Sequence, residues 1–142
     1  MTRIIIHNAL GKEVGWFDAS LCSNDEQLIH AMKETMLFAE FQEFGKKFDV
    51  GSHSPVAVLH WSHIEPPHRK KGWAHKGVLS FLASARRNGA KLALLKVAYE
   101  SGRDWKKELR WKSEFYQKSG FQGFSHDDVR SPLMYCTLQE KS

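Results

Sequence analysis

Three consecutive basic residues, Arg69, Lys70 and Lys71, stand directly before Gly72, and an apolar pattern of helical spacing begins at Ala74. Such a turn presents the unpaired backbone N–H groups of a first helical turn at the positive end of the helix, where proteins bind phosphate groups. Gly72 lets the backbone approach an anion closely, and the basic side chains add attraction. The turn predicts an anion site, although a solvated basic turn without a ligand has the same local pattern.

Three residues could transfer protons beside such an anion site, namely Tyr116, His63 and Glu65. His63 and Glu65 lie at the end of an apolar stretch just ahead of the basic turn, and either could act as a general base, directly or through water. Both could equally be surface or loop residues. Tyr116 could be a packing residue of an amphipathic helix with its hydroxyl group at the surface. The residue types alone leave these alternatives open.

Four histidines, His60, His63, His68 and His75, are close enough in sequence to suggest a metal site. Imidazole is a common zinc ligand, but a zinc site needs several ligands that converge on one point. His60 and His63 belong to a predicted strand, in which residues three positions apart face opposite sides. We therefore expect these histidines not to converge, and we predict no metal site.

The part of the chain from Pro55 onward alternates between strand and helix patterns. Pro55–Ile64 (PVAVLHWSHI) has the composition of a central strand, and helical spacing then runs from Ala74 to the end signal Asn88-Gly89. A further strand, a second amphipathic helix and two short strands follow. Their predicted ranges are Lys91–Ala98, 105–119, Phe121–Phe124 and Leu133–Leu138, with the polar residues 125–131 as a hairpin or loop between the last two.

The N-terminal part of the chain has a less regular pattern. Arg3–His7 and Glu13–Phe17 are predicted to be short strands on either side of a turn. Ser23 followed by Glu26 matches a capping box, and apolar residues then recur at helical spacing until Gly45, a candidate C-terminal cap. We predict one helix between this capping box and Gly45.

Composition and element order limit the fold class. With 142 residues and 42% hydrophobic content, residues 1–142 are long enough for one compact core and too short for two ordinary domains. The element order predicts a mixed α/β sheet of the α+β-like kind. The net charge of +5 favours an anionic ligand. Cys22 and Cys136 match no metal or disulfide framework, and no apolar run reaches the roughly 20 residues that span a bilayer, so we expect a cytoplasmic protein without a membrane partner.

Two segments resemble the signatures of the GCN5-related N-acetyltransferase (GNAT) superfamily. Ile64–Ala74 (IEPPHRKKGWA) is similar to the signature in which an aliphatic strand end and a proline precede Arg or Gln, two residues, Gly, one residue, and Gly or Ala. Phe115–Phe121 (FYQKSGF) is similar to the later family pattern FY-x-x-x-GF. The resemblance covers about residues 55–138 and follows the family's order of elements.

The resemblance implies a GNAT-like central mixed sheet flanked by helices, with a site for acetyl-coenzyme A (acetyl-CoA). Tyr116 matches the family tyrosine that protonates the leaving thiolate, whereas Lys96 stands where some relatives place a base glutamate, so the general base stays unassigned. The implied cofactor residues are Ser62, His63 and Ile64 for the pantetheine arm, and Arg69, Lys70, Lys71, Gly72, Trp73 and Ala74 for the pyrophosphate.

These observations predict an N-acetyltransferase that transfers an acetyl group from acetyl-CoA to a primary amine within a ternary complex, with no intermediate on the enzyme. Relatives commonly have two N-terminal helices, and the single predicted helix would leave the acceptor cleft open enough for a protein lysine or N-terminus. A GNAT-fold binding module without activity is the first alternative. A small basic nucleic-acid-binding protein that uses Trp105–Lys112, where aromatic and cationic residues alternate, is the second.

Overall fold

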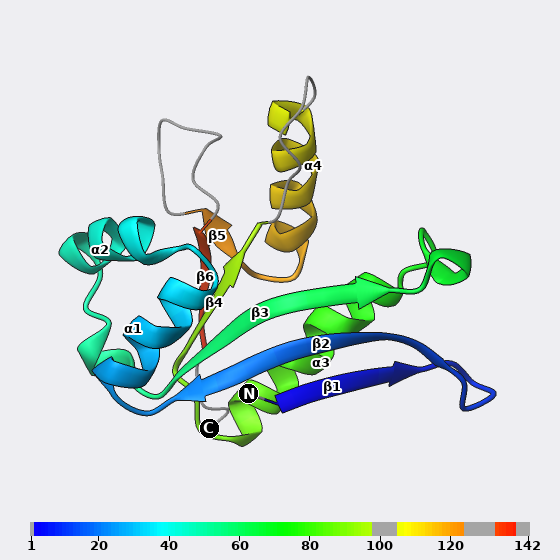
Figure 1. Ribbon diagram of the computed structural model, residues 1–142, viewed down its shortest axis with the longest axis horizontal. Coiled ribbons are helices and arrows are strands. Elements are labelled where there is room, and N and C mark those ends of the chain that lie inside the picture. Colours follow the sequence, from blue (N-terminus) through cyan, green and yellow to red (C-terminus); the bar gives the residue numbers. More distant parts are fainter. Residues whose placement is uncertain (1, 98–104, 124–132, 139–142) are drawn as a thin grey trace.

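A computed structural model describes residues 2–97, 105–123 and 133–138 of the chain, which form a six-stranded sheet in the order β1-β2-β3-β4-β6-β5 (Figure 1). The strands are β1 (Thr2–His7), β2 (Glu13–Cys22), β3 (Val56–Ile64), β4 (Leu92–Lys96), β5 (Gln122–Gly123) and β6 (Leu133–Thr137). The helices are α1 (Asp25–Glu34), α2 (Phe38–Lys47), α3 (Trp73–Arg87) and α4 (Trp105–Lys118), with 3₁₀ turns η1 (Gly51–His53) and η2 (Pro66–His68). The sheet is mixed, because β3 and β4 pair in parallel while the other described pairs are antiparallel.

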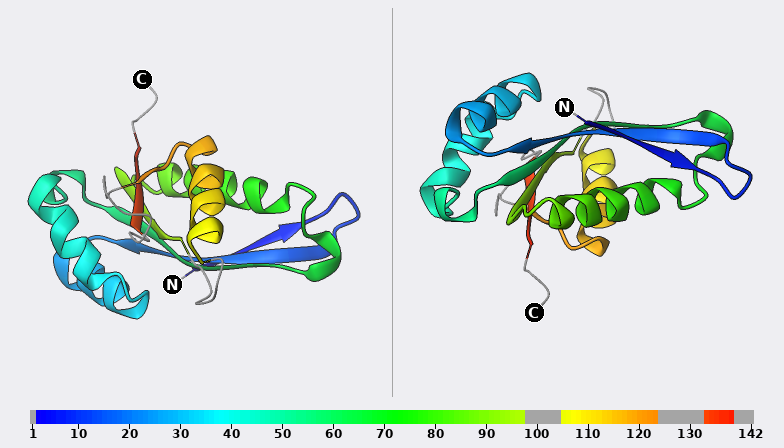
Figure 2. Two further views of the ribbon diagram at one scale, coloured as in Figure 1. Left: turned by 90° about the horizontal axis from the view of Figure 1, so that it is seen from above. Right: turned by 90° about the horizontal axis from the view of Figure 1, so that it is seen from below.

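Helices cover both faces of this sheet. Helices α3 and α4 lie on one face, and α1 and α2 lie on the other, toward one end of the long strands (Figure 2). Strand β4 shows how the sequence builds both cores: Leu92 and Leu94 pack with the α1 and α2 side, whereas Ala93 and Leu95 pack with the α3 side. A strand buried on both faces reads as a continuous apolar run, which is the pattern of β4.

Strands β3 and β4 pair over only part of the length of β3. Their ladder joins Val56–Leu59 to Leu92–Leu95, and within the described residues β3 then continues with β2 alone. The β2–β3 register shifts so that Leu59 pairs with Ala19 and Trp61 with Asp18, which leaves His60 as the extra residue of a β-bulge. The two parallel strands therefore separate at His60, and backbone groups of β3 beyond this point are open to a ligand.

The prediction of one N-terminal helix was wrong, because the structure has two, α1 and α2. The break lies at Thr35 and Met36: Met36 adopts a left-handed conformation with φ of 61°, and the Leu37 N–H donates to the carbonyl oxygen of Met32 at 2.8 Å. This local reversal brings the fully buried Leu37 and Phe44 into one core with α1. A left-handed residue at a helix end is usually glycine, so methionine gave no sequence signal.

The caps of these helices also differ from the prediction. Asn24, not Ser23, caps α1: its side-chain oxygen accepts from the Gln27 N–H at 2.9 Å, and the Gln27 side chain accepts from the Ser23 N–H at 2.8 Å. Asparagine and glutamine serve here in place of the predicted serine and glutamate. Gly45 does not end a helix, since α2 continues through it to Lys47.

The other element predictions agree with the structure apart from their ends. Strand β2 extends to Cys22 rather than Phe17, because it is a central strand that pairs with β1 and with β3. Helices α3 and α4 occupy the two predicted C-terminal helical segments. Ala98, Phe124 and the predicted hairpin or loop 125–131 lie outside the described residues.

Candidate functional site

The chain leaves the free end of β3 through η2 and the basic turn and enters α3. Arg69 fixes the start of this turn, because its Nε atom donates to the carbonyl oxygen of Ile64 at 2.9 Å. The Glu65 N–H donates to the Val14 carbonyl oxygen at 2.8 Å, which holds the same corner to β2. One side-chain and one backbone hydrogen bond therefore hold the start of the basic turn at the end of the sheet.

The backbone of the turn adopts left-handed conformations at two positions. Lys70 has φ of 63° and Gly72, the N-cap of α3, has φ of 84°. A non-glycine residue in this region is strained, and such residues gather at ligand sites. Residues that alternate between right- and left-handed conformations direct successive N–H groups into one concavity, which binds anions. A side chain at Gly72 would meet no atom within 4 Å, so its glycine is required by conformation and not by crowding.

From Lys70 to His75, the backbone N–H groups of this turn have no intramolecular acceptor among the described residues. The first backbone bond of α3 runs from the Lys76 N–H to the Gly72 carbonyl oxygen at 3.1 Å. A helix of 15 residues thus begins with its free donors and positive dipole end at an open turn, which favours a phosphate.

A cavity of about 630 Å³ lies beside this turn, between the free end of β3, the start of α3 and helix α4. Its volume falls in the range of ordinary ligand pockets. The lining consists of Ser62, His63, Ile64, His68, Arg69, Lys70, Gly72, Trp73, Ala74, His75, Trp111, Lys112 and Phe115. All the predicted cofactor residues except Lys71 are among them. Apolar rings line the cavity together with three permanent cations, Arg69, Lys70 and Lys112, and the described lining contains no acidic side chain. The cavity therefore suits a ligand with anionic and apolar parts.

Helix α4 supplies a wall of the cavity that the sequence interpretation missed. Trp111 and Phe115 are one helical turn apart and line the cavity together with Lys112. His75 of α3 connects the two helices, since its Nδ1 atom lies 3.2 Å from the Ser119 hydroxyl oxygen and its ring meets the edge of Phe115 with centroids 6.2 Å apart. The alternation of aromatic and cationic residues in α4 was visible in the sequence, but it supported only the alternative of a nucleic-acid face.

Comparison with solved structures finds matches along nearly the whole chain. A mosquito arylalkylamine N-acetyltransferase-like protein matches with a TM-score of 0.64 and 11% identity over 96% of this chain and 74% of its own. A GCN5-related N-acetyltransferase from Kribbella flavida matches with a TM-score of 0.55 and 14% identity over 96% and 67%. A GNAT-family acetyltransferase from Staphylococcus aureus Mu50 gives 0.53 and 12% over 95% and 66%, so the chain spans slightly under two thirds of that protein. No protein-family model and no curated protein matches the chain.

This chain has the GNAT fold. The matches cover both faces of the sheet, because they span at least 95% of the chain. Identities of 11–14% establish a shared fold and no more. The prediction of a GNAT-like mixed sheet flanked by helices is therefore confirmed, and the chemistry has to be argued from the residues of this chain.

Tyr116 lies next to the cavity of this GNAT fold but is not one of its lining residues. Its ring packs against the core on the α3 and α4 side, with ring centroids 5.2 Å from Phe115 and 6.3 Å from Phe121. Burial raises the pKa of the Tyr116 hydroxyl above its ordinary value. The hydroxyl is therefore a proton donor, and not a base, at neutral pH.

His63 and Glu65 lie together at the rim of the cavity. The His63 Nε2 atom is 3.7 Å from Glu65 Oε1, and the His63 ring lies 5.8 Å from the Trp16 ring. His63 lines the cavity, whereas Glu65 begins the turn behind it. The two side chains can exchange a proton with each other or with water, so both stay candidates for the general base.

Two further observations concern a metal site and a membrane span. His60 is buried against α1, away from the cavity that His63, His68 and His75 line, and no group of three metal-ligating side chains gathers among residues 2–97, 105–123 and 133–138. Across those same residues, every helix is too short or too polar to span a bilayer.

Proposed function

We propose that this protein is an acyl-CoA-dependent N-acyltransferase that uses acetyl-CoA and a primary amine. The observation that supports this proposal most strongly is the coincidence of three features at one place. The cavity, the strained basic turn with its free N–H groups, and the separation of β3 from β4 all occur at the C-terminal end of β3. This combination suits an extended ligand that carries phosphate groups.

The residues present fit acetyl-CoA part by part. The free N–H groups of residues 70–75 would hold the pyrophosphate, with Arg69, Lys70 and Lys71 adding attraction. The open backbone edge at Ser62–Ile64 would pair with the amide groups of the pantetheine arm. Trp111 and Lys112 on α4 offer a ring and a cation to the nucleotide end. When bound, acetyl-CoA would supply an acetyl group already activated as a thioester.

The residues of the chain would then carry out direct transfer to the amine. Backbone N–H groups at the opening between β3 and β4 would stabilise the negative charge on the acetyl oxygen. Tyr116 would return a proton to the leaving sulfur, for which its raised pKa keeps the hydroxyl protonated. His63 or Glu65 at the rim could remove a proton from the amine. We place this activity in the cytoplasm, since Cys22 and Cys136 are both free thiols.

The class of acceptor is a primary amine, with no narrower choice supported by the cavity. The argument for a protein lysine or N-terminus relied on a missing N-terminal helix, and that helix is present as α2. The mosquito protein is described as arylalkylamine N-acetyltransferase-like, which makes a small aromatic amine an equally reasonable acceptor. Small amines and protein amines therefore have to be tested side by side.

The test has two stages. Titration calorimetry with acetyl-CoA should show binding, and the melting temperature should rise with acetyl-CoA concentration because only folded protein binds it. Mass spectrometry should then detect acetylated product from a panel of n-butylamine, phenethylamine, spermidine, a lysine peptide and a peptide with a free N-terminus. Absence of acetyl-CoA binding would refute the proposal. Binding without product from any amine would instead identify a binding module.

A further inference from the structure

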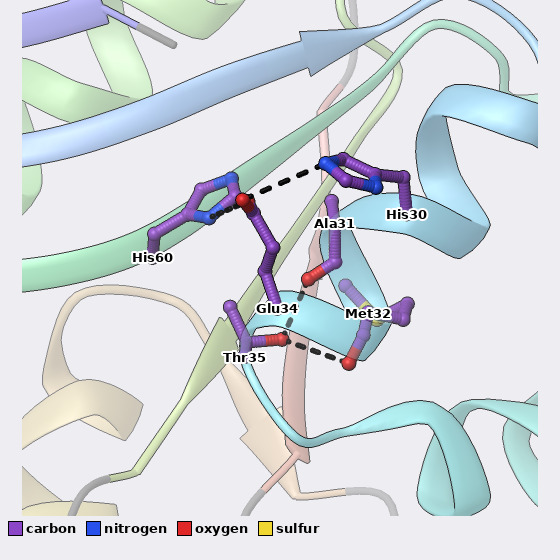
Figure 3. A network of polar contacts seen from close by, with 6 residues as sticks. All are labelled: His30, Ala31, Met32, Glu34, Thr35 and His60. Atoms are coloured by element: carbon purple, nitrogen blue, oxygen red, sulfur yellow. Dashed lines mark hydrogen bonds and ion pairs between the residues drawn. The ribbon is translucent and has the colours of Figure 1, made fainter.

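His60 occupies the point where the two parallel strands of the sheet separate. It is the extra residue of the β-bulge in β3 and the first residue after the β3–β4 ladder ends at Leu59. The His60 ring extends from β3 toward Glu34 at the end of α1 (Figure 3). It therefore lies on the face of the sheet opposite to α3 and α4, which flank the proposed cofactor cavity (Figure 2).

The imidazole of His60 is buried without a hydrogen-bonding partner. Its side chain is 1% exposed, and within the described residues neither ring nitrogen has a hydrogen bond. The nearest polar group is Glu34, whose Oε2 atom lies 3.6 Å from His60 Nδ1. A buried polar group without a partner destabilises a protein by roughly 1–3 kcal/mol, so its presence suggests a partner that arrives during function.

Glu34 links this buried ring to solvent. Its carboxylate is 44% exposed, and its other oxygen, Oε1, lies 3.5 Å from Nε2 of His30, whose side chain is 76% exposed. The three side chains form a line from the interior to the surface, as Figure 3 shows. This line offers a path by which a proton on His60 would reach Glu34 and then water or His30.

The two faces of the sheet have different roles in the proposed function. Acetyl-CoA would reach the opening between β3 and β4 from the α3 and α4 face, where the cavity lies. Because the cofactor would occupy that approach, the α1 face is the one left for the amine. On this second face β3 places His60 at the opening itself, whereas His63, which pairs with Trp16 on the same face, lies three residues farther along the strand.

We propose that His60 is the general base for the acceptor amine and that Glu34 relays the proton to solvent. This inference rests on the proposed function. In the step, the amine nitrogen forms a bond to the acetyl carbonyl carbon and the carbon–sulfur bond breaks, with the electron pair leaving on sulfur. The proton lost by nitrogen goes to His60, and the sulfur takes a proton from Tyr116. No other reactant is required.

The charges around His60 support this role. Burial lowers the pKa of His60, and the Glu34 carboxylate partly offsets this effect. Asp18 on β2, which is ion-paired with Arg3 on β1, also favours the protonated ring, while His30 opposes it. Lys96, at the end of β4, belongs by strand alternation to the same face. The ring is therefore neutral at neutral pH and can accept a proton, and Glu34 stabilises the imidazolium that forms.

The experiment compares His60→Gln, Glu34→Gln and His7→Gln with the wild type, using acetyl-CoA and the panel amine that the wild type acetylates fastest. His60→Gln should lower kcat by about 100-fold, leave the KM for acetyl-CoA unchanged, and abolish the acidic limb of the pH profile of kcat, measured with acetyl-CoA and the amine both saturating. Glu34→Gln should lower kcat about 5- to 10-fold and shift that limb to lower pH, because removing the carboxylate lowers the His60 pKa further. The exposed His7 on β1 is the control, and His7→Gln should match the wild type.

The possible outcomes separate this inference from the proposed function. If the wild type acetylates no amine, the proposed function fails and the inference fails with it. If the wild type is active and His60→Gln keeps its rate and its acidic limb, the inference alone is overturned. If His60→Gln does not fold, Glu34→Gln decides, since Glu34 is half exposed: an acidic limb that stays at the wild-type pH would overturn the relay.

Discussion

Two glycines on the same helix, Gly72 and Gly77, illustrate opposite uses of one residue type. Gly72 caps α3 with φ of 84°, and a Cβ there would meet no atom within 4 Å. Gly77, one and a half turns later, has ordinary helical geometry, and a Cβ there would overlap the ring of Phe17 on β2. The first glycine permits the left-handed turn at the start of α3, and the second lets the helix approach the sheet. Function and stability can therefore be perturbed separately along α3.

The largest expected effect is the loss of acetyl-CoA binding in Gly72→Asp. The substitution places bulk and a negative charge at the N–H groups proposed to hold the pyrophosphate. We expect affinity to fall by more than about 100-fold, measured by titration calorimetry, while the folded state loses roughly 1–2 kcal/mol from the left-handed conformation.

Gly89→Asp is the matched control for this variant. Gly89 follows the other end of α3, has φ of 81° and would also meet no atom within 4 Å. It does not line the cavity, so Gly89→Asp should carry similar strain and keep wild-type affinity. Unchanged acetyl-CoA affinity in folded Gly72→Asp would show that the site is elsewhere.

The converse effect is expected at Gly77, where Gly77→Ala should reduce stability and leave the affinity of the folded protein unchanged. Alanine favours a helix interior by about 1 kcal/mol over glycine, but overlap with a buried ring costs about 3 kcal/mol, so the net loss should be near 2 kcal/mol. Denaturant unfolding would measure it. Gly45→Ala in α2, where a Cβ is free, should instead stabilise by about 0.5–1 kcal/mol. The same sign for both variants would contradict this interpretation of the packing.

Tyr116→Phe tests the chemistry separately from binding and packing. The phenylalanine ring keeps the contacts with Phe115 and Phe121, so stability and acetyl-CoA affinity should change little. Turnover should fall by about 10- to 100-fold, toward the lower end for general acid catalysis, because a thiolate is a fair leaving group and water can substitute. Steady-state rates at saturating acetyl-CoA would show this. A wild-type rate would leave Tyr116 as a packing residue.

Most features that depend on neighbouring residues were predicted correctly, whereas features that depend on long-range contacts were not. The basic turn, Gly72 and the start of α3 could be predicted because the residues that begin a helix are a local feature. The break at Met36 could not, because a methionine adopts the left-handed conformation there to bring Leu37 into the core. Local propensity gives no sign of such a tertiary requirement.

The contribution of α4 to the cavity was missed for the same reason. Trp111, Lys112 and Phe115 are far in sequence from the turn that they face, and only the packing of α4 beside α3 brings them together. Helical spacing places Trp111 and Phe115 one turn apart on α4, but it does not say what that side of the helix contacts. The long-range part of the site therefore required the structure.

The smallest expected effect concerns this wall of the cavity, in the variant Lys112→Ala. Lys112 lines the cavity and its Nζ atom lies 5.8 Å from the centroid of the exposed Trp111 ring, so its charge is close to solvent and screened. We expect acetyl-CoA affinity to fall about 3- to 10-fold at low ionic strength and by less at 0.5 M salt, because screening already removes most of the attraction there.

Lys107→Ala is the matched control, since this exposed lysine belongs to the same helix but does not line the cavity. Titrations of both variants at two salt concentrations distinguish a local contact from a general effect of net charge, because the two substitutions change that charge equally. Equal losses of affinity in the two variants would mean that α4 acts only through the overall charge of the protein, and the nucleotide end of acetyl-CoA would then have to be placed away from Trp111.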